Sequence, residues 1–118
     1  MAGPVVHFEI VSKKAPALMK FYAKVFGWKI DADNPMKYGM VKTGAKAKIA
    51  LGGGICAPSP KGEEYVTFYI AVDDLDATLK AVKAAGGKTA MKPMQVPGGP
   101  LIAQFKDPAG NIMGILKG

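Results

Sequence analysis

The sequence predicts an α+β fold built from two consecutive βαβββ modules. Strand-like and helix-like patterns follow one another in the same order on both sides of a short proline-rich segment, residues 58–62. A shift of sixty residues also aligns identical residues, among them Phe8 with Phe68, Ile10 with Ile70, Lys20 with Lys80 and Gly27 with Gly87. We therefore expect an internal duplication within a single domain over residues 1–118, with modules at 4–57 and 63–117.

The first module is expected to begin with a strand over Val5–Val11. These residues are mostly β-branched or aromatic, and side chains alternate between the two faces of a strand. Phe8 and Ile10 then share one face, whereas His7 and Glu9 share the other. The strand therefore places the single histidine of the chain beside a carboxylate.

A helix over residues 12–26 follows, because apolar residues recur there at helical spacing. We expect Ser12 to cap it, Pro16 to lie in its first turn and Gly27 to end it. Three short strands complete the module, at residues 28–31, 38–43 and 48–51.

The second module repeats this order. A strand over residues 65–72 leads into a helix that opens at Asp73–Asp76, where the carboxylates cap the helix and oppose its dipole, and that stops at Gly86–Gly87. Three more strands are expected, at residues 88–96, 101–106 and 111–116. Each module then has one sheet face without a helix, and we expect these curved faces to line a shared cavity.

Composition narrows the classes of function. The chain is 49% hydrophobic and 21% charged, which is typical of a globular protein. Its net charge of +7 comes from scattered lysines, and the lack of arginine argues against nucleic-acid recognition. No apolar stretch could span a bilayer, the first residues do not resemble a signal peptide, and Cys56 has no partner for a disulfide. We expect a cytoplasmic protein that binds neither nucleic acid nor membrane.

Several segments resemble the glyoxalase/bleomycin-resistance/dioxygenase (vicinal-oxygen-chelate) superfamily. They are Val6–Ile10, Lys20–Trp28, Ala71–Ala77, Ala84–Gly87 and Phe105–Gly114, the last of which contains an Asp-Pro-x-Gly-Asn hairpin. The resemblance covers essentially the whole chain. It implies paired βαβββ modules, commonly a homodimer, and activities that include lyases, dioxygenases, epimerases and drug-sequestering proteins. Because a fold does not determine a function, the site residues must decide among these.

The metal site that the resemblance implies is incomplete in this sequence. Metal-using members place a ligand, usually histidine or glutamate, on the first and last strand of each module. His7 matches one position, but the others fall on Thr67, Gly114 and the glycines Gly52–Gly54. A catalytic transition metal needs about three protein side chains. We therefore expect no metal and no other cofactor, unless two copies of a dimer share a site.

His7 and Glu9 offer a metal-free alternative as an acid/base pair. Tyr69, on the matching strand of the second module, could orient a carbonyl or phenolic ligand. A different interpretation is that His7 and Glu9 only satisfy each other in a vestigial site. Candidate ligand-binding residues are Thr67, Trp28, Met40, Met94, Met113 and Gly114, although aromatic and methionine side chains more often belong to a core.

These observations favour a glyoxalase-like protein that binds a small, largely apolar or carbonyl-bearing molecule. If it is an enzyme, we expect a lyase or isomerase that uses His7 and Glu9. A metal-dependent lyase of the lactoylglutathione lyase type, or a dioxygenase, is the alternative. A purely structural protein whose cavity is too small for a ligand is a third hypothesis.

Overall fold

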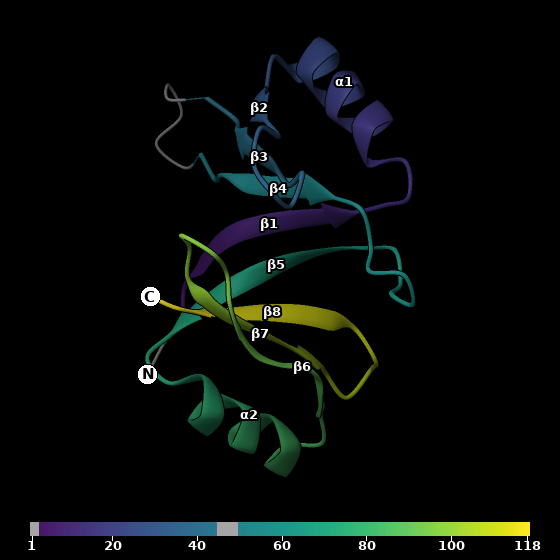
Figure 1. Cartoon of the computed structure of the whole chain (residues 1–118). Helices are drawn as coiled ribbons and strands as arrows, with labels where there is room; N and C mark the ends of the chain where they lie inside the picture. The colour runs from purple at the N-terminus through teal and green to yellow at the C-terminus, as the bar shows by residue number, and fades with distance from the viewer. Residues whose placement is uncertain (1–2, 45–49) are drawn as a thin grey trace. The chain divides into compact units, whose positions relative to one another are not determined.

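The computed structural model describes residues 3–44 and 50–118 (Figure 1). Within these ranges the elements follow the order βαβββ twice, so the predicted α+β fold of two such modules is confirmed. The elements are β1 (Val5–Val11), α1 (Ala15–Phe26), β2 (Lys29–Asp31), β3 (Gly39–Lys42), β4 (Gly53–Cys56), β5 (Tyr65–Val72), α2 (Leu75–Ala84), β6 (Lys88–Gln95), β7 (Leu101–Lys106) and β8 (Ile112–Lys117).

The chain divides into two compact units. The first unit is His7–Val66, and the second unit joins Thr67–Gly118 to the described part of residues 1–6. The backbone N–H of Ala71 donates to the carbonyl of Pro4 at 2.9 Å, which ties the N-terminal segment to the second unit. Each unit has its own helix and its own cluster of buried side chains.

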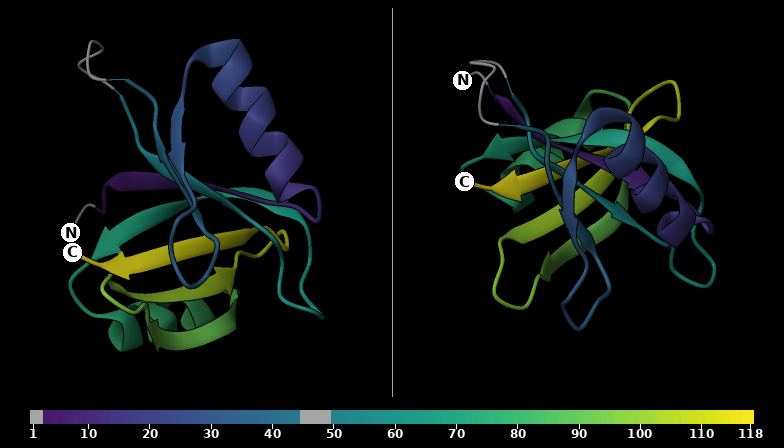
Figure 2. Two further views of the ribbon diagram at one scale, coloured as in Figure 1. Left: turned by 45° about the horizontal axis from the view of Figure 1, so that its top comes forward. Right: turned by 90° about the horizontal axis from the view of Figure 1, so that it is seen from above.

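The first unit has the strand order β2-β3-β4-β1, in which β1 and β4 are parallel and the other pairs antiparallel. Helix α1 covers one face (Figure 2), where Ile10, Val41 and Ile55 are buried. Alternation along β1 turns His7 and Glu9 to the opposite face. We call this opposite face, which no helix of the unit covers, the helix-free face.

The second unit has the order β5-β8-β7-β6, with β5 and β8 parallel. Its helix α2 packs against a cluster that contains Leu75, Leu79, Ala103 and Ile115. The strand pairing of one unit corresponds to that of the other at a shift of sixty residue numbers. In the first unit Glu9 lies opposite Gly54 and Ile10 opposite Ile55. In the second unit Tyr69 lies opposite Gly114 and Ile70 opposite Ile115. The predicted duplication therefore extends to the register of the hydrogen-bonded strands.

Strand β4 lies elsewhere than the sequence suggested. Of the predicted strand 48–51, residues 48 and 49 fall outside the described residues, and residues 50 and 51 are not in a strand. The strand is Gly53–Cys56 instead, and it pairs with β1 on one side and β3 on the other. Glycine has a low intrinsic preference for strands, so the local sequence does not predict β4. The strand forms because it hydrogen-bonds to a neighbouring strand on each side.

The start of α1 also differs from the prediction. The helix begins at Ala15, with Lys14 at the N-cap position and no side-chain cap. Ser12 instead accepts a hydrogen bond from the backbone of Lys14 at 3.0 Å and donates one to Glu64 at 3.2 Å. Its hydroxyl thus organises the loop before the helix, since the helix begins three residues later and the hydroxyl accepts from the backbone of Lys14 instead of from the first turn.

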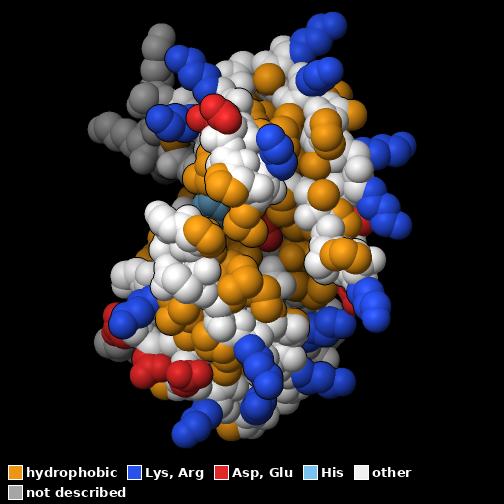
Figure 3. All heavy atoms as spheres, in the orientation of Figure 1, with side chains coloured by type: hydrophobic (Ala, Val, Ile, Leu, Met, Phe, Trp, Pro, Cys, Tyr) orange, Lys and Arg blue, Asp and Glu red, His pale blue; other side chains and the backbone are white. Residues whose placement is uncertain are grey.

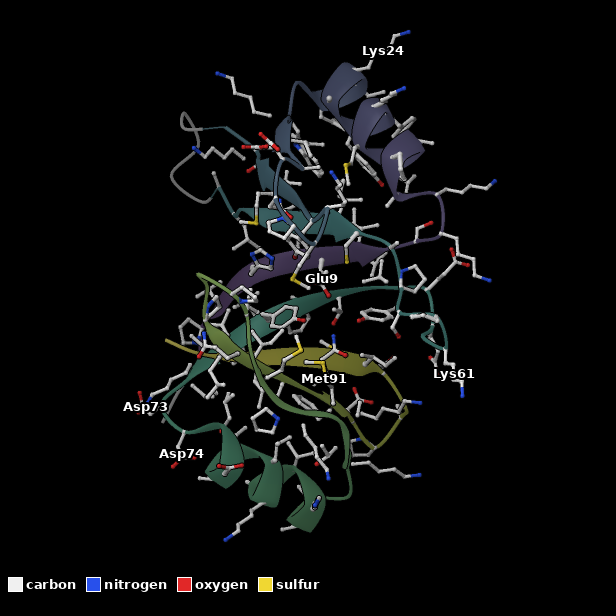
Figure 4. The ribbon with its side chains drawn as sticks, viewed as in Figure 1. Glu9, Lys24, Lys61, Asp73, Asp74 and Met91 are labelled. Carbon is white, nitrogen blue, oxygen red and sulfur yellow. The ribbon has the colours of Figure 1, made fainter. Side chains whose placement is uncertain are left out.

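Other boundaries follow the sequence closely. Gly27 ends α1 in the left-handed conformation, at φ 69°, and Asp74 caps α2 by accepting from the backbone N–H of Ala77 at 3.0 Å (Figure 4). Apart from β4, each strand agrees with its predicted range to within one residue at either end. None of the helices in the described part of the chain is long and apolar enough to cross a membrane.

Lysine side chains are dispersed over the face of the molecule shown in Figure 3 and do not gather in one patch. This distribution matches the scattered lysines of the sequence, which account for its positive net charge.

Candidate functional site

The hydroxyl of Tyr38 links His7 to Glu9 on the helix-free face of the first unit. His7 Nε2 lies 2.9 Å from this hydroxyl, which donates to Glu9 Oε2 at 2.8 Å. A phenol has one proton and an ionised carboxylate can only accept, so the phenol proton goes to Glu9 and the hydrogen between His7 and Tyr38 comes from His7. The arrangement therefore assigns a proton to Nε2 of His7 and aligns two hydrogen bonds in one direction, from His7 through Tyr38 to Glu9.

Burial sets the protonation of groups in this site. It lowers the pKa of His7 below its ordinary value of 6.5, because an apolar environment penalises the imidazolium. Burial, and after it the negative charge of Glu9, raises the pKa of the Cys56 thiol to about 12. At neutral pH the imidazole can therefore accept a proton, whereas the thiol stays protonated and is a poor nucleophile.

Gly54 makes room for Tyr38. A Cβ atom added at Gly54 would collide with the Tyr38 ring, and one added at the neighbouring Gly53 would collide with the ring of Phe8. Successive residues of a strand face opposite sides, so each glycine accepts an aromatic ring on its own side. Gly53 and Gly54 thus let two aromatic rings approach β4 closely, one on each face.

The second unit contains a related arrangement. A Cβ added at Gly114 would collide with the ring of Tyr69, which is only 3% exposed. Gln104 Nε2 donates to the Tyr69 hydroxyl at 3.2 Å. Gln104 pairs with Gly114 across β7 and β8, just as Met40 pairs with Gly54 across β3 and β4. Each unit therefore has a tyrosine ring against the glycine of its last strand.

Sequence reasoning found His7 and Glu9 but missed Tyr38, which connects them. Tyr38 was expected only as the first residue of a strand, and in the structure it lies just before β3. Its one local signal is the preceding Asn-Pro turn, which does not show where the ring points. Gln104 gave no signal beyond the alternation of its strand.

The candidate ligand-binding residues of the first unit lie on different faces. Met40 is 51% exposed and shares a cross-strand row with Glu9 and Gly54 on the helix-free face. Trp28 instead belongs to the aromatic packing beside α1, with its ring centroid 4.9 Å from that of Tyr22 and 5.4 Å from that of Phe8. The structure thus groups Met40, but not Trp28, with the acid/base residues.

The candidates of the second unit are similarly divided. The hydroxyl of Thr67 donates to the backbone carbonyl of Ile112 at 2.6 Å and also lies 3.5 Å from Met113 Sδ. It therefore ties β5 to β8. Met94 is 40% exposed on β6, and Gly114 underlies Tyr69.

The residues present do not fit the metal site that the family resemblance implies. Gly54 and Gly114 occupy the last-strand positions, and Tyr38 and Tyr69 fill the space into which a ligand side chain would project. Thr67 directs its hydroxyl to the backbone. Within residues 3–44 and 50–118, no three His, Cys, Asp or Glu side chains come together as a possible metal site.

Comparison with known proteins identifies the family. The model of the Glyoxalase/Bleomycin resistance protein/Dioxygenase superfamily matches residues 5–115. The chain belongs to this superfamily. The resemblance found in the sequence motifs is thereby confirmed.

Named relatives within the superfamily differ in length and in name. "Putative glyoxylase CFP32" of Mycobacterium tuberculosis is 30% identical over 118 residues, which cover 98% of this chain and 44% of that protein. The chain thus spans less than half the length of that relative. "Probable lactoylglutathione lyase" of Vibrio cholerae is 32% identical over 110 residues, covering 84% of this chain and 79% of that protein.

Solved structures agree on the fold. A methylmalonyl-CoA epimerase in complex with methylmalonyl-CoA and NH4+ superimposes with a TM-score of 0.66 at 15% identity, covering 99% of this chain and 95% of that chain. At this level of identity the likeness establishes the fold and leaves the function to the site.

Proposed function

We propose that this glyoxalase-superfamily chain binds a small carbonyl-bearing or phenolic molecule on the helix-free face of its first unit, without a catalytic metal. His7, Tyr38 and Glu9 act there as a proton-transfer group. The observation that carries the proposal is the Tyr38 hydroxyl, which is hydrogen-bonded to the imidazole on one side and to the carboxylate on the other.

The direction of these hydrogen bonds suits removal of a proton from a ligand. When a proton reaches Nδ1 of His7, the Nε2 proton can pass to Tyr38 and the Tyr38 proton to Glu9. The imidazole and the phenol then end neutral, and Glu9 holds the proton. A neutral imidazole is the competent acceptor, and the lowered pKa of His7 provides it at neutral pH.

The surroundings of the group favour a flat, weakly polar ligand. The Tyr38 ring covers Gly54 on the helix-free face, and Met40 adds an exposed thioether in the same row. The rings of His7 and Tyr38 are nearly parallel, with an interplanar angle of 18°. Planar carbonyl compounds and phenols can lie against such a surface while a hydrogen bond to an edge orients them.

The probe 4-hydroxyacetophenone tests this proposal, because it has a phenol, a ketone and an exchangeable methyl group. The single histidine gives one set of imidazole NMR signals. In EDTA-treated protein we expect the probe to shift these signals, and in D2O we expect faster deuteration of its methyl group. Tyr38→Phe should weaken both effects, and His7→Ala should abolish the deuteration.

Tyr22→Phe is the matched control, since Tyr22 packs beside Trp28 on the covered side of the same unit. It should leave binding and deuteration unchanged. Imidazole signals that respond neither to this probe nor to related small ketones and phenols would contradict the proposal.

A metal-dependent lyase is the second candidate, which the name of the Vibrio cholerae relative favours. The side chains at the positions where the family binds its metal do not support it, because only His7 among them is a good metal ligand. Elemental analysis of the purified protein, combined with an assay using methylglyoxal and glutathione, separates the two candidates. One bound nickel, zinc or iron ion per chain, together with turnover that EDTA removes, would replace our first proposal. The homodimer and the cytoplasmic location expected from the sequence stay predictions.

A further inference from the structure

The side chain of Asn34 holds the backbone of Tyr38 at two points. Asn34 Oδ1 accepts a hydrogen bond from the N–H of Tyr38 at 2.9 Å, and Asn34 Nδ2 donates to the carbonyl of Tyr38 at 2.7 Å. Both backbone polar groups of the tyrosine are thus engaged by one amide. A side chain that branches from a backbone pinned in this way has little freedom to move its ring.

The remainder of the β2–β3 loop is closed around the same residue. The N–H of Asn34 donates to the carbonyl of Ala32 at 2.9 Å, and its own carbonyl accepts from Lys37 at 3.0 Å. Lys37 adopts φ 53°, a left-handed conformation that lysine rarely takes and that contacts around it must maintain. The loop therefore holds Lys37 in an unfavourable backbone conformation while it places Tyr38 against Gly54.

The second unit provides an internal comparison. In its β6–β7 turn, Gln95 Nε2 donates to the carbonyl of Gly99 at 2.7 Å, so a side-chain amide again reaches the carbonyl four residues ahead. That carbonyl belongs to a glycine, which has no ring to place. The same kind of hydrogen bond from a side-chain amide closes a turn in the second unit and holds Tyr38 in the first.

We propose that Asn34 is a positioning residue that holds Tyr38 over Gly54 and thereby sets the tautomer of His7 and the direction of the hydrogen bonds from His7 to Glu9. A role of Asn34 in catalysis rests on the proposed function, whereas its effect on His7 does not. This effect can be measured on the protein alone, because it concerns the state of the imidazole without a ligand.

The titration of His7 is a suitable readout because it responds to the burial that the Tyr38 ring provides. Among the described residues, the strands of the first unit place Glu9, Lys29, Asp31 and Lys42 as charged groups on the helix-free face, together with the titratable Cys56 and Tyr38. A substitution at Asn34 changes none of them. For the uncharged variant Asn34→Ala, we therefore expect a change in the imidazole to reflect the position of the Tyr38 ring and the burial that it provides.

The experiment is a pH titration of the imidazole ¹⁵N and ¹³C signals in the wild type and in Asn34→Ala. We expect the His7 midpoint to rise toward its ordinary value, because a released ring lets water reach the imidazole. We also expect the share of the Nε2–H tautomer to fall. Asn34→Asp can still accept from the Tyr38 N–H but cannot donate to its carbonyl, so it should lower the share of the Nε2–H tautomer by less. Its added carboxylate raises the midpoint by itself, so this variant is compared by tautomer alone.

Gln95→Ala is the matched control, since it removes the corresponding amide from the other turn. It should leave the His7 midpoint and tautomer unchanged. In a Tyr38→Phe background the tautomer should no longer respond to Asn34→Ala, because the hydroxyl that selects it is gone. The indole signal of the single tryptophan reports whether each variant is folded, and Asn34→Asp serves if the alanine variant is not.

An imidazole that is unchanged in folded Asn34→Ala or Asn34→Asp would overturn the inference, as would an equal response to Gln95→Ala. This outcome is distinct from a failure of the proposed function. If the wild type does not respond to 4-hydroxyacetophenone, the proposed function fails, whereas the effect of Asn34 on His7 is measured without that probe.

Discussion

Replacing Gly54 by alanine should expel Tyr38 from its place between His7 and Glu9. The added Cβ would collide with the ring, which would have to leave together with its two hydrogen bonds. A hydrogen bond to a charged group contributes about 1.5–3 kcal/mol and a neutral one about 0.5–1.5 kcal/mol. Alanine offsets about 0.5–1 kcal/mol of this loss, because glycine is unfavourable within a strand. We expect Gly54→Ala to lower the free energy of unfolding by about 1–4 kcal/mol.

Urea unfolding followed by Trp28 fluorescence measures this change, and a double-mutant cycle identifies its cause. Tyr38→Ala removes the ring, so Gly54→Ala should cost nothing on that background. Gly114→Ala is the matched control in the second unit, where the added Cβ meets Tyr69. It should also destabilise the protein but leave the NMR signals of His7 unchanged. An equal cost of Gly54→Ala with and without the Tyr38 ring would refute the reasoning.

Three further predictions concern acid stability, thiol reactivity and helix capping. The free energy of unfolding should fall as the pH drops from 6.5 through the lowered pKa of His7, because the unfolded chain binds the proton first. The slope, measured by urea unfolding at several pH values, should be at most about 1.4 kcal/mol per pH unit. His7→Gln should lack this slope. Cys56 should react with iodoacetamide at pH 8 about 1000-fold more slowly in the native than in the unfolded chain, and equal rates would contradict its raised pKa. Asp74→Ala should cost about 1 kcal/mol in urea unfolding, whereas no change would mean that its bond to Ala77 is not stabilising.

Much of the fold could be predicted because local chemistry and tertiary packing agree along most of the chain. The strands Val5–Val11 and Tyr65–Val72 are rich in β-branched and aromatic residues, and their predicted bounds match the structure. Gly27 and Asp74 mark helix ends for reasons that act within a few residues. The second module repeats the order of elements of the first, so each element of the pattern could be checked against its counterpart sixty residues away.

Prediction failed where a distant residue decides the outcome. Ser12 is a good helix cap by type, but the helix begins at Ala15, and Ser12 lies in the preceding loop, where its hydroxyl donates to Glu64 far along the chain. Gly53 and Gly54 are poor strand formers, yet β1 and β3 hydrogen-bond to them from both sides. Trp28 was a candidate for a ligand site although aromatic side chains more often belong to a core, and the neighbouring rings place it in the packing beside α1.

The sequence by itself determined the order of elements, the duplication, the family and the pairing of His7 with Glu9 on one strand face. The order of elements and the strand faces follow from periodicity and from residues close together in the chain, and the family follows from the resemblance of its motifs. Only the tertiary structure decided that Tyr38 stands between His7 and Glu9 and that tyrosine rings occupy the space above Gly54 and Gly114. A glycine in the sequence shows that a side chain is missing, but only the folded chain shows which neighbour uses the room.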